Sequence, residues 1–382
     1  MVNPATLAPV TASTPTESRL PSHIPALDGI RGFAVILVVI RHTLSWPMEI
    51  SAHPGNWQFL FWYWTKMMWV GVDLFFVLSG FLITKILLEN QNSPRLFRTF
   101  YTRRACRILP LYFLLVAVAY LARALLPHTA LWQKLFEFQP QWYYYATLTQ
   151  NIFMGPAGTT GGIALAVTWS LAVEEQFYLV LPAVTRFFPK TLLPWLFAGG
   201  IPCALLIRLH WNDARSYYWS PSHADSLLIG CLLAWVCLQP RALAWLQRQV
   251  SGLNLLLGIL LCGMLVINQM PEFYQWFSDT WFSLCFGVIL LISVTQPQHW
   301  LTRFLGLRWL RYTGDISYAV YLLHFPILAV LFWLLRGTTP AINTVADLLI
   351  PALTVVITIA LASLSLTFFE KRWIKLGHRA KY

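Results

Sequence analysis

Long apolar stretches separated by short polar segments dominate the chain. A helix that spans a membrane needs about 20 mostly apolar residues. Stretches of this kind lie at roughly 27–46, 68–88, 108–126, 163–187, 192–210, 223–239, 252–270, 276–295, 315–336 and 346–369. They predict an all-α, polytopic membrane protein with about ten transmembrane helices. A shorter aromatic stretch, about 138–154, is expected to be re-entrant or to lie along the membrane interface.

The composition supports this prediction. Of the 382 residues, 57% are hydrophobic and only 11% are charged, which is too little charge for a soluble domain of this size. Residues 1–23 are rich in Pro, Thr and Ser, and we expect them to form a disordered cytoplasmic tail. The membrane domain is expected to cover 24–369, and residues 370–382 to form a basic cytoplasmic tail.

Basic residues are distributed unevenly between the two sides that alternating spans would create. The side that holds the N-terminus carries 18 Lys and Arg residues, and the opposite side carries six. Cytoplasmic segments of membrane proteins are enriched in Lys and Arg. We therefore expect both termini in the cytoplasm, in a multi-pass protein surrounded by the lipids of the inner (plasma) membrane. The net charge of +12 does not indicate a nucleic-acid partner, because no basic arm with interleaved aromatic residues occurs.

The six cysteines are scattered, most of them within apolar stretches. They form no Cys-x-x-Cys pair and no Cys/His cluster with zinc spacing. We therefore predict neither a disulfide nor a metal site.

Arg31 and His42 both lie in the first apolar stretch. A helix advances about 100° and 1.5 Å per residue, so these two side chains lie within about 20° on one face, roughly 16 Å apart along the axis. Ionisable groups inside a membrane are costly and often functional. The pKa of an imidazole suits a general base, so His42 is the candidate for proton chemistry, and a His at the membrane interface is the alternative. Arg31 is expected to face the protein interior, and the alternative is that its side chain extends to the lipid headgroups at the inner membrane surface.

Three acidic residues lie in later stretches. Asp73 could orient the His42 imidazole, as the acid does in a hydrolase triad, or cap the start of a helix. Glu174 and Glu175 point about 100° apart and therefore need separate partners. One of them could pair with Arg31, and the other could contact a substrate hydroxyl. We take Glu175 as a candidate catalytic residue and Glu174 as a candidate binding residue.

The remaining candidates are polar groups that could bind substrate or donor. Arg104 and Arg107 share a face if they are helical and could clamp a phosphate-bearing donor. Membrane orientation and anionic lipid are the alternative explanation for them. Ser170, Asp225 and His324 are expected to contact substrate, although polar groups in membrane helices also serve as helix–helix hydrogen bonds.

Five segments together resemble the acyltransferase-3 family of integral membrane O-acyltransferases. They appear in the order of the family and begin Leu27-Asp28-Gly29-Ile30-Arg31 (with ten residues to His42), Gly71-Val72-Asp73-Leu74-Phe75, Arg103-Arg104-Ala105-Cys106-Arg107, Trp169-Ser170-Leu171-Ala172-Val173-Glu174-Glu175 and Ser317-Tyr318 through His324. The resemblance implies a ten-helix membrane domain over about 24–369. It places the family's helix-1 Arg and His on Arg31 and His42, and its Arg-x-x-Arg on Arg104 and Arg107. Where the family often has an Arg and an aromatic residue before Asp225, this chain has His223 and Ala224.

The resemblance also implies a reaction. An acyl group, often acetyl, passes from a cytoplasmic thioester donor to a hydroxyl, commonly on a sugar. We therefore expect acyl-CoA as a co-substrate, no bound cofactor and a sugar-containing acceptor. Some relatives carry an appended hydrolase-like domain, so this chain is expected to act alone or with a separate glycan-assembly partner. Since buried ionisable residues also mark transport paths, a transporter or flippase of a lipid-linked sugar is the alternative.

Overall fold

The structure is a computed structural model that describes residues 20–21, 23–49, 52–137, 139–211, 213–267, 269 and 271–382, with the side chains of 271–276 left out. All the regular elements in this part of the chain are helices. The all-α prediction is therefore confirmed. Most of the tail predicted at 1–23 lies outside the described residues.

The first half of the chain forms the helices α1 (Pro25–Ile40), η1 (Arg41–Ser45), α2 (Trp46–Glu49), α3 (Trp57–Thr65), η2 (Lys66–Val70), α4 (Gly71–Glu89), α5 (Leu96–Leu125), α6 (Ala130–Phe136), α7 (Trp142–Ala146), α8 (Gln150–Ala157) and α9 (Thr168–Phe187). The second half forms α10 (Leu193–His210), α11 (Ala214–Tyr218), η3 (Ser220–His223), α12 (Ala224–Cys237), α13 (Pro240–Arg248), α14 (Val250–Ile267), α15 (Pro271–Thr295), α16 (Trp300–Leu305), α17 (Arg308–Arg336), η4 (Val345–Leu348), α18 (Leu349–Leu364), η5 (Ser365–Glu370) and α19 (Lys371–His378).

In the described residues, seven helices are long and apolar enough to cross a membrane: Trp57–Glu89, Leu96–Leu125, Leu193–His210, Val250–Ile267, Phe277–Thr295, Arg308–Arg336 and Val345–His378. An eighth results if Ser220–Cys237 and Pro240–Arg248, which meet at a 99° bend, count as one span. The predicted number of ten is therefore not confirmed. The stretches 27–46 and 163–187 do form helices, but α1 runs for 16 residues before a π-helical turn begins, and α9 carries Glu174 and Glu175 in its middle.

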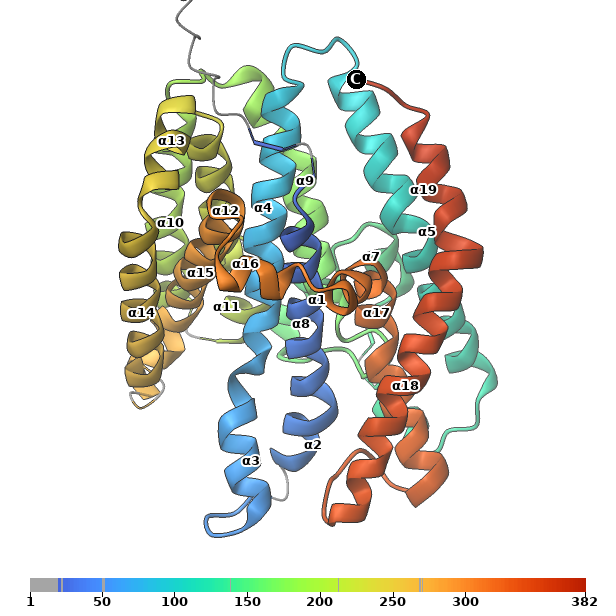
Figure 1. The fold of residues 1–382 in the computed structure, drawn as a ribbon. Coiled ribbons are helices and arrows are strands. Elements are labelled where there is room, and N and C mark those ends of the chain that lie inside the picture. The colour runs from blue at the N-terminus through green and yellow to red at the C-terminus, as the bar shows by residue number, and fades with distance from the viewer. Residues whose placement is uncertain are drawn as a thin grey trace, which may run out of the picture.

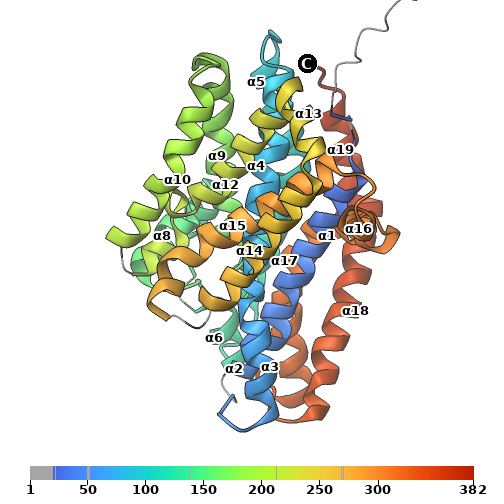
Figure 2. The ribbon, with the colours of Figure 1, turned by 60° about the vertical axis from the view of Figure 1, so that its left-hand side comes forward.

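Helices α1, α4, α12 and α17 lie in the centre of the bundle (Figures 1 and 2). Their closest crossings are made by glycines. A Cβ built on Gly32 of α1 would lie 2.1 Å from the Leu310 carbonyl oxygen of α17, and one on Gly80 of α4 would lie 2.0 Å from the Leu227 carbonyl oxygen of α12. Because both crossings leave no room for a side chain, glycine fixes how these four helices pack.

Residues 370–382, which were expected to form a tail, are for the most part a helix. Helix α19 follows the π-helical turn η5 directly and packs against α5, as Figure 1 shows. The Arg103 Nε donates to the carbonyl oxygen of Ala380 at 3.0 Å, and the Thr99 hydroxyl donates to that of Lys381 at 2.9 Å. These contacts hold the end of the described chain against the basic start of α5.

The aromatic stretch near 138–154 forms two short helices, α7 and α8, which lie at mid-height of the bundle in Figure 1. Residue 138 lies outside the described part of the chain. Helix α8 packs against α9 and α11. Gln176 of α9 donates to the Leu148 carbonyl oxygen and to Asn151, which joins these short helices to the longer one.

Candidate active site

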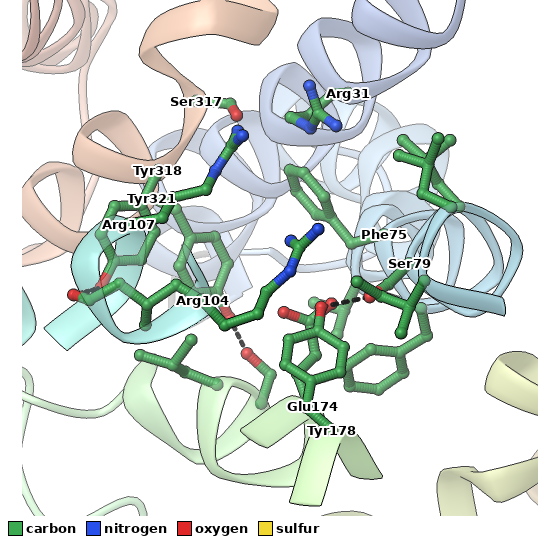
Figure 3. A pocket seen from close by; sticks show the side chains of 18 residues that line it. Arg31, Phe75, Ser79, Arg104, Arg107, Glu174, Tyr178, Ser317, Tyr318 and Tyr321 are labelled. Atoms are coloured by element: carbon green, nitrogen blue, oxygen red, sulfur yellow. Dashed lines mark hydrogen bonds between the residues drawn. The ribbon is translucent and has the colours of Figure 1, made fainter. Parts of the chain in front are cut away.

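A cavity lies among α1, α4, α5, α9 and α17 (Figure 3). Four ionisable Arg and Glu side chains line it, together with tyrosines, serines and apolar residues. The lining consists of Arg31, Val72, Phe75, Phe76, Leu78, Ser79, Leu82, Ile83, Arg104, Arg107, Ile108, Ser170, Leu171, Glu174, Tyr178, Ser317, Tyr318 and Tyr321. Four of the five segments that carry the family resemblance reach the cavity with at least two residues, and the first segment reaches it through Arg31.

Three guanidinium groups point into this cavity, as Figure 3 shows. Arg104 and Arg107 lie one turn apart on α5 and face the same space, as their spacing predicts. The Arg104 guanidinium lies 5.8 Å from the ring centre of Tyr178. Arg31 of α1 is held by Asp28, one turn earlier, at 3.1 Å between Nη1 and Oδ1. The i,i+3 spacing of Asp28 and Arg31 was a readable signal for this pair.

Glu174 is the carboxylate among the described residues that line the cavity. It interacts with the hydroxyls of Ser79 and Tyr178, which are hydrogen-bonded to each other, and with the charges of Arg104 and Arg31. Glu175 is not a lining residue, and its Oε1 is buried without a hydrogen-bond partner in the described structure. The divergence of the two side chains follows the prediction, and Glu174 is the one that faces the cavity.

Two tyrosines of α17 form another wall of the cavity. The Tyr321 hydroxyl donates to the Val167 carbonyl oxygen at 3.0 Å and lies 2.5 Å from the Ser170 hydroxyl. Tyr318 donates to the Ile108 carbonyl oxygen at 2.8 Å. Ser170 therefore does reach the cavity, where it is hydrogen-bonded to Tyr321.

His42 lies just beyond Tyr321, in the π-helical turn η1. Its Nδ1 is 2.8 Å from the Nε2 of His324, and its ring stacks on Phe325 with 4.6 Å between ring centres. The Tyr321 ring lies 6.1 Å from that of His324. One aromatic side chain therefore connects the arginine-lined cavity with a pair of histidines.

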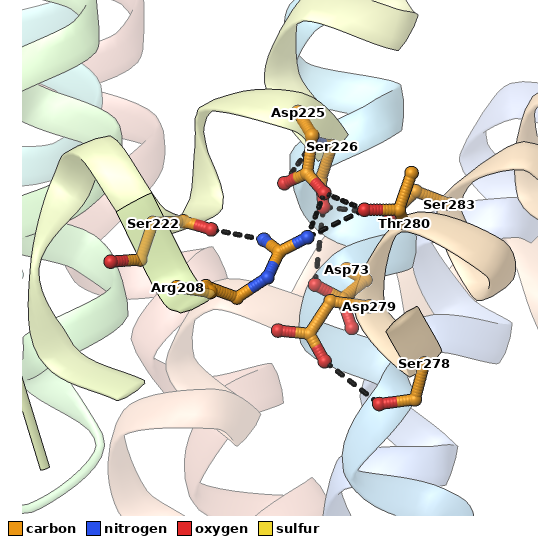
Figure 4. A network of polar contacts seen from close by, with 9 residues as sticks. All are labelled: Asp73, Arg208, Ser222, Asp225, Ser226, Ser278, Asp279, Thr280 and Ser283. Atoms are coloured by element: carbon orange, nitrogen blue, oxygen red, sulfur yellow. Dashed lines mark hydrogen bonds and ion pairs between the residues drawn. The ribbon is translucent and has the colours of Figure 1, made fainter. Parts of the chain in front are cut away.

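Asp73 does not hold the His42 imidazole, contrary to our expectation. Its Oδ1 accepts a hydrogen bond from Ser226 of α12 at 3.2 Å, and the imidazole is paired with His324 instead. Figure 4 shows Asp73 within a polar network of α10, α12 and α15. Helix α4 turns this face toward α12 because Gly80 and Gly230 allow the two helices to touch.

Asp225 belongs to the same network, and its expected contact with substrate is replaced by an ion pair. The Arg208 Nη2 lies 2.7 Å from the Asp225 Oδ2, and both side chains are almost completely buried, at 3% and 0% exposed (Figure 4). Arg208 also donates to the Ser222 carbonyl oxygen. The family's Arg before Asp225 is absent from this sequence, and Arg208 of α10 supplies a cation in its place.

In the part of the chain that the structure describes, no group of three or more His, Cys, Asp or Glu residues is arranged to hold a metal ion. The arrangement thus rests on arginines, hydroxyls, one facing carboxylate and two imidazoles. Such a set can bind an anionic ligand and move a proton.

Comparison with known proteins places this arrangement in a family. The family described as an acyltransferase domain matches residues 24–368. The chain is 28% identical to the peptidoglycan O-acetyltransferase OatA of Listeria monocytogenes, with 91% of this chain and 55% of the relative covered. It is 28% identical to the O-acetyltransferase OatA of Staphylococcus aureus, with coverage of 94% and 58%. It is 29% identical to the putative peptidoglycan O-acetyltransferase YrhL of Bacillus subtilis, with coverage of 94% and 56%.

The chain thus spans a little over half the length of these curated relatives. No solved structure matches it at a significant level. The family match covers all five segments and nearly the whole membrane domain. The protein belongs to the acyltransferase-3 family of integral membrane acyltransferases.

Proposed function

We propose that the protein is a membrane O-acyltransferase that moves an acyl group, acetyl in the first instance, from acyl-CoA to a hydroxyl of a sugar-containing acceptor. One observation carries this proposal. A cavity lined by three arginines is joined through Tyr321 to the pair of His42 and His324. A phosphate-bearing donor and a proton-accepting group would therefore meet in one continuous site. The names of the relatives, which are peptidoglycan O-acetyltransferases, support a polymer of sugars as the acceptor.

The donor would enter from the side of the basic loops. The guanidinium groups of Arg104 and Arg107 would bind the CoA phosphates, since Arg pairs with phosphate oxygens in bidentate geometry. The thioester would then extend past Arg31 toward Tyr321. In the orientation we propose, with both termini in the cytoplasm of a bacterial cell, this end of the cavity faces the CoA pool.

The chemistry would take place at His42. Its free ring nitrogen removes the proton from the acceptor hydroxyl, and the resulting oxygen attacks the thioester carbonyl carbon. The new C–O bond forms as the C–S bond breaks, and the CoA thiolate takes up the proton that His42 holds. The products are an O-acyl sugar and free CoA, so that atoms and charge balance. Glu174, beside the hydroxyls of Ser79 and Tyr178, would offset part of the arginines' positive charge before the donor binds.

The first test is transfer of label from radiolabelled acetyl-CoA to soluble peptidoglycan fragments by the full chain in lipid nanodiscs. We expect His42→Ala to lower the rate by about 100-fold or more, because general base catalysis contributes that much. His53→Ala is the matched control, since His53 is exposed in the loop between α2 and α3, and we expect it to keep full activity. Full activity in His42→Ala would overturn the proposed role of this residue.

The same preparation separates the enzyme from a transporter. Release of free CoA together with labelled fragments supports the acyltransferase. Movement of a lipid-linked sugar across the bilayer without consumption of acetyl-CoA would establish a transporter or flippase and contradict the proposal.

A further inference from the structure

The two hydrogen bonds of His324 define which of its ring nitrogens carries the proton. Its Nδ1 lies 3.0 Å from the carbonyl oxygen of Val320, one turn earlier in α17. A carbonyl oxygen can only accept a hydrogen bond, so the Nδ1 of His324 must be the donor. In a neutral imidazole the other nitrogen, Nε2, is then an acceptor.

The surroundings of His324 favour the neutral form of its imidazole. Its side chain is completely buried, at 0% exposed. It is hydrogen-bonded to His42 and to the Val320 carbonyl oxygen and lies beside the rings of Tyr321 and Phe325, and none of these partners is a carboxylate. A cation that is buried without an acidic partner is strongly disfavoured, because its lost hydration is not replaced.

The state of His42 follows from that of His324. The Nε2 of His324 accepts, so the His42 Nδ1, 2.8 Å away, must donate. A neutral His42 then has its proton on Nδ1 and an unprotonated Nε2. Phe325, stacked on His42 at 4.6 Å, fixes the plane of the ring, and Trp46 packs edge-on against Phe325 at 5.2 Å.

We propose that His324 is a positioning residue that holds His42 in the tautomer whose Nε2 can accept the proton of the acceptor hydroxyl. A neighbouring imidazole would thus do what a carboxylate does in a hydrolase triad, without bringing a charge into the protein interior. This inference rests on the proposed function. It explains why Asp73 is free to take part in the network with Ser226.

Three variants test which atom of His324 matters. His324→Phe keeps an aromatic ring between Tyr321 and Phe325 but loses both hydrogen bonds. His324→Asn places its amide where Nδ1 lies, so it reaches the Val320 carbonyl oxygen but not His42. His324→Gln places a carbonyl oxygen where Nε2 lies, so it can still accept from His42. The last two variants differ by one methylene group and form a matched pair.

We expect His324→Phe and His324→Asn to lower kcat by about 100-fold, with KM for acetyl-CoA changed by no more than about twofold, since the lost interaction acts on the chemical step. We expect His324→Gln to recover at least about tenfold of that loss. If Phe, Asn and Gln lower kcat to the same level, or if all three keep wild-type kcat, His324 does not act as an acceptor for His42 and the inference fails.

A spectroscopic measurement tests the tautomer without any turnover. In chain labelled with ¹⁵N-histidine, the His42 signal, identified by its loss in His42→Gln, should show a protonated Nδ1 and a bare Nε2. In His324→Phe this preference should shift toward the other tautomer. A wild-type signal with the proton on Nε2 would overturn the inference even in an active enzyme. A wild-type chain without acyl transfer but with the expected tautomer would overturn only the proposed function.

Discussion

Among the single residues that line the cavity, positively charged side chains outnumber negatively charged ones. Arg31, Arg104 and Arg107 line it, and Glu174 is the carboxylate of the described chain that faces them there. Arg31 is already paired with Asp28. Arg104 lies over the rings of Phe100 and Tyr178, which leaves its N–H groups available at the edge. An anionic ligand would therefore find donors that are already positioned by the protein.

The arginines of α5 should act on the nucleotide part of the donor and not on its thioester. We expect Arg104→Ala and Arg107→Ala to raise KM for acetyl-CoA by about tenfold or more, because each removes a charge-assisted hydrogen bond. The same variants should be close to wild type with acetyl-pantetheine, a donor without the nucleotide phosphates. Steady-state kinetics with the two donors measures this difference.

Arg98→Ala is the control for the arginine variants, since Arg98 lies on the same helix but is exposed and is not a lining residue. An equal loss with both donors in the Arg104 and Arg107 variants would show that these residues support the fold or the chemical step and do not bind phosphate.

At the residue scale, the sequence predicted which face of its helix a side chain occupies better than it predicted which residue that side chain contacts. Spacing along one helix correctly placed Arg104 and Arg107 on one face and separated Glu174 from Glu175, because both arguments depend only on helix geometry. The contact of His42 with His324 joins residues 282 positions apart, and no local pattern reports on such a contact. The buried ion pair of Arg208 with Asp225 was missed for a related reason, since an Arg at the end of an apolar stretch looks like an exposed one.

At the scale of elements, the crossing of α1 and α17 positions the cavity. A Cβ built on Gly32 would lie 2.1 Å from the Leu310 carbonyl oxygen, and a Cβ built on Gly314 would lie 2.0 Å from the Asp28 carbonyl oxygen. Backbone lies on both sides of the crossing, so neither helix can move away by rotating a side chain. The crossing lies next to Arg31, whose direction therefore depends on it.

Gly32→Ala should separate the two helices and destabilise the protein by about 1–3 kcal/mol, as overpacking does elsewhere. The measurement is the midpoint of thermal unfolding in detergent. Gly199→Ala in α10 is the matched control, because an added Cβ there meets nothing within 4 Å, and alanine is the better helix former. A Gly32→Ala protein as stable as the Gly199→Ala protein would contradict the close crossing.

The apolar stretches predicted most of the long helices but not the residues at which these helices begin and end. The stretches at 68–88 and 346–369 are parts of continuous helical runs, Trp57–Glu89 and Val345–His378, that extend past the predicted bounds. Residues 370–382 were expected to be a tail because hydropathy stops where the membrane stops, whereas helical hydrogen bonding does not. The Arg103 contact with Ala380 shows what stabilises one such extension, and it depends on a residue far away in the chain.

At the scale of the whole molecule, the ends of the helices separate into a basic side and a less basic side. The loop between α4 and α5 and the C-terminus lie at the top of Figure 1, and the loops between α2 and α3 and between α17 and α18 lie at the bottom. The top carries Arg95, the arginines at the start of α5 and the Lys and Arg residues of α19. Because cytoplasmic segments are enriched in Lys and Arg, we expect the basic side to face the cytoplasm.

The orientation can be measured by labelling single cysteines with a membrane-impermeant maleimide in intact cells. In a chain whose native cysteines are replaced by Ser, His53→Cys should react from outside. Lys381→Cys should react only after the cells are permeabilised, because the positive-inside rule places it in the cytoplasm. Both positions are exposed, so permeabilised cells provide the control for reactivity. Reaction of Lys381→Cys in intact cells would reverse the orientation that we expect.

The π-helical turn at Arg41–Ser45 limits which insertions and deletions this segment can tolerate in evolution. In that turn the Trp46 N–H donates to the Arg41 carbonyl oxygen, five residues earlier, so it holds one residue more than an α-helical turn would. Deletion of one residue there would let a regular α-helix form in which the Trp46 N–H keeps its carbonyl partner, so the flanking helices would stay in register. The side chains inside the turn, His42 among them, would change direction because each remaining residue would then advance by about 100°. Natural selection on this segment therefore acts on its length as well as on the identity of His42.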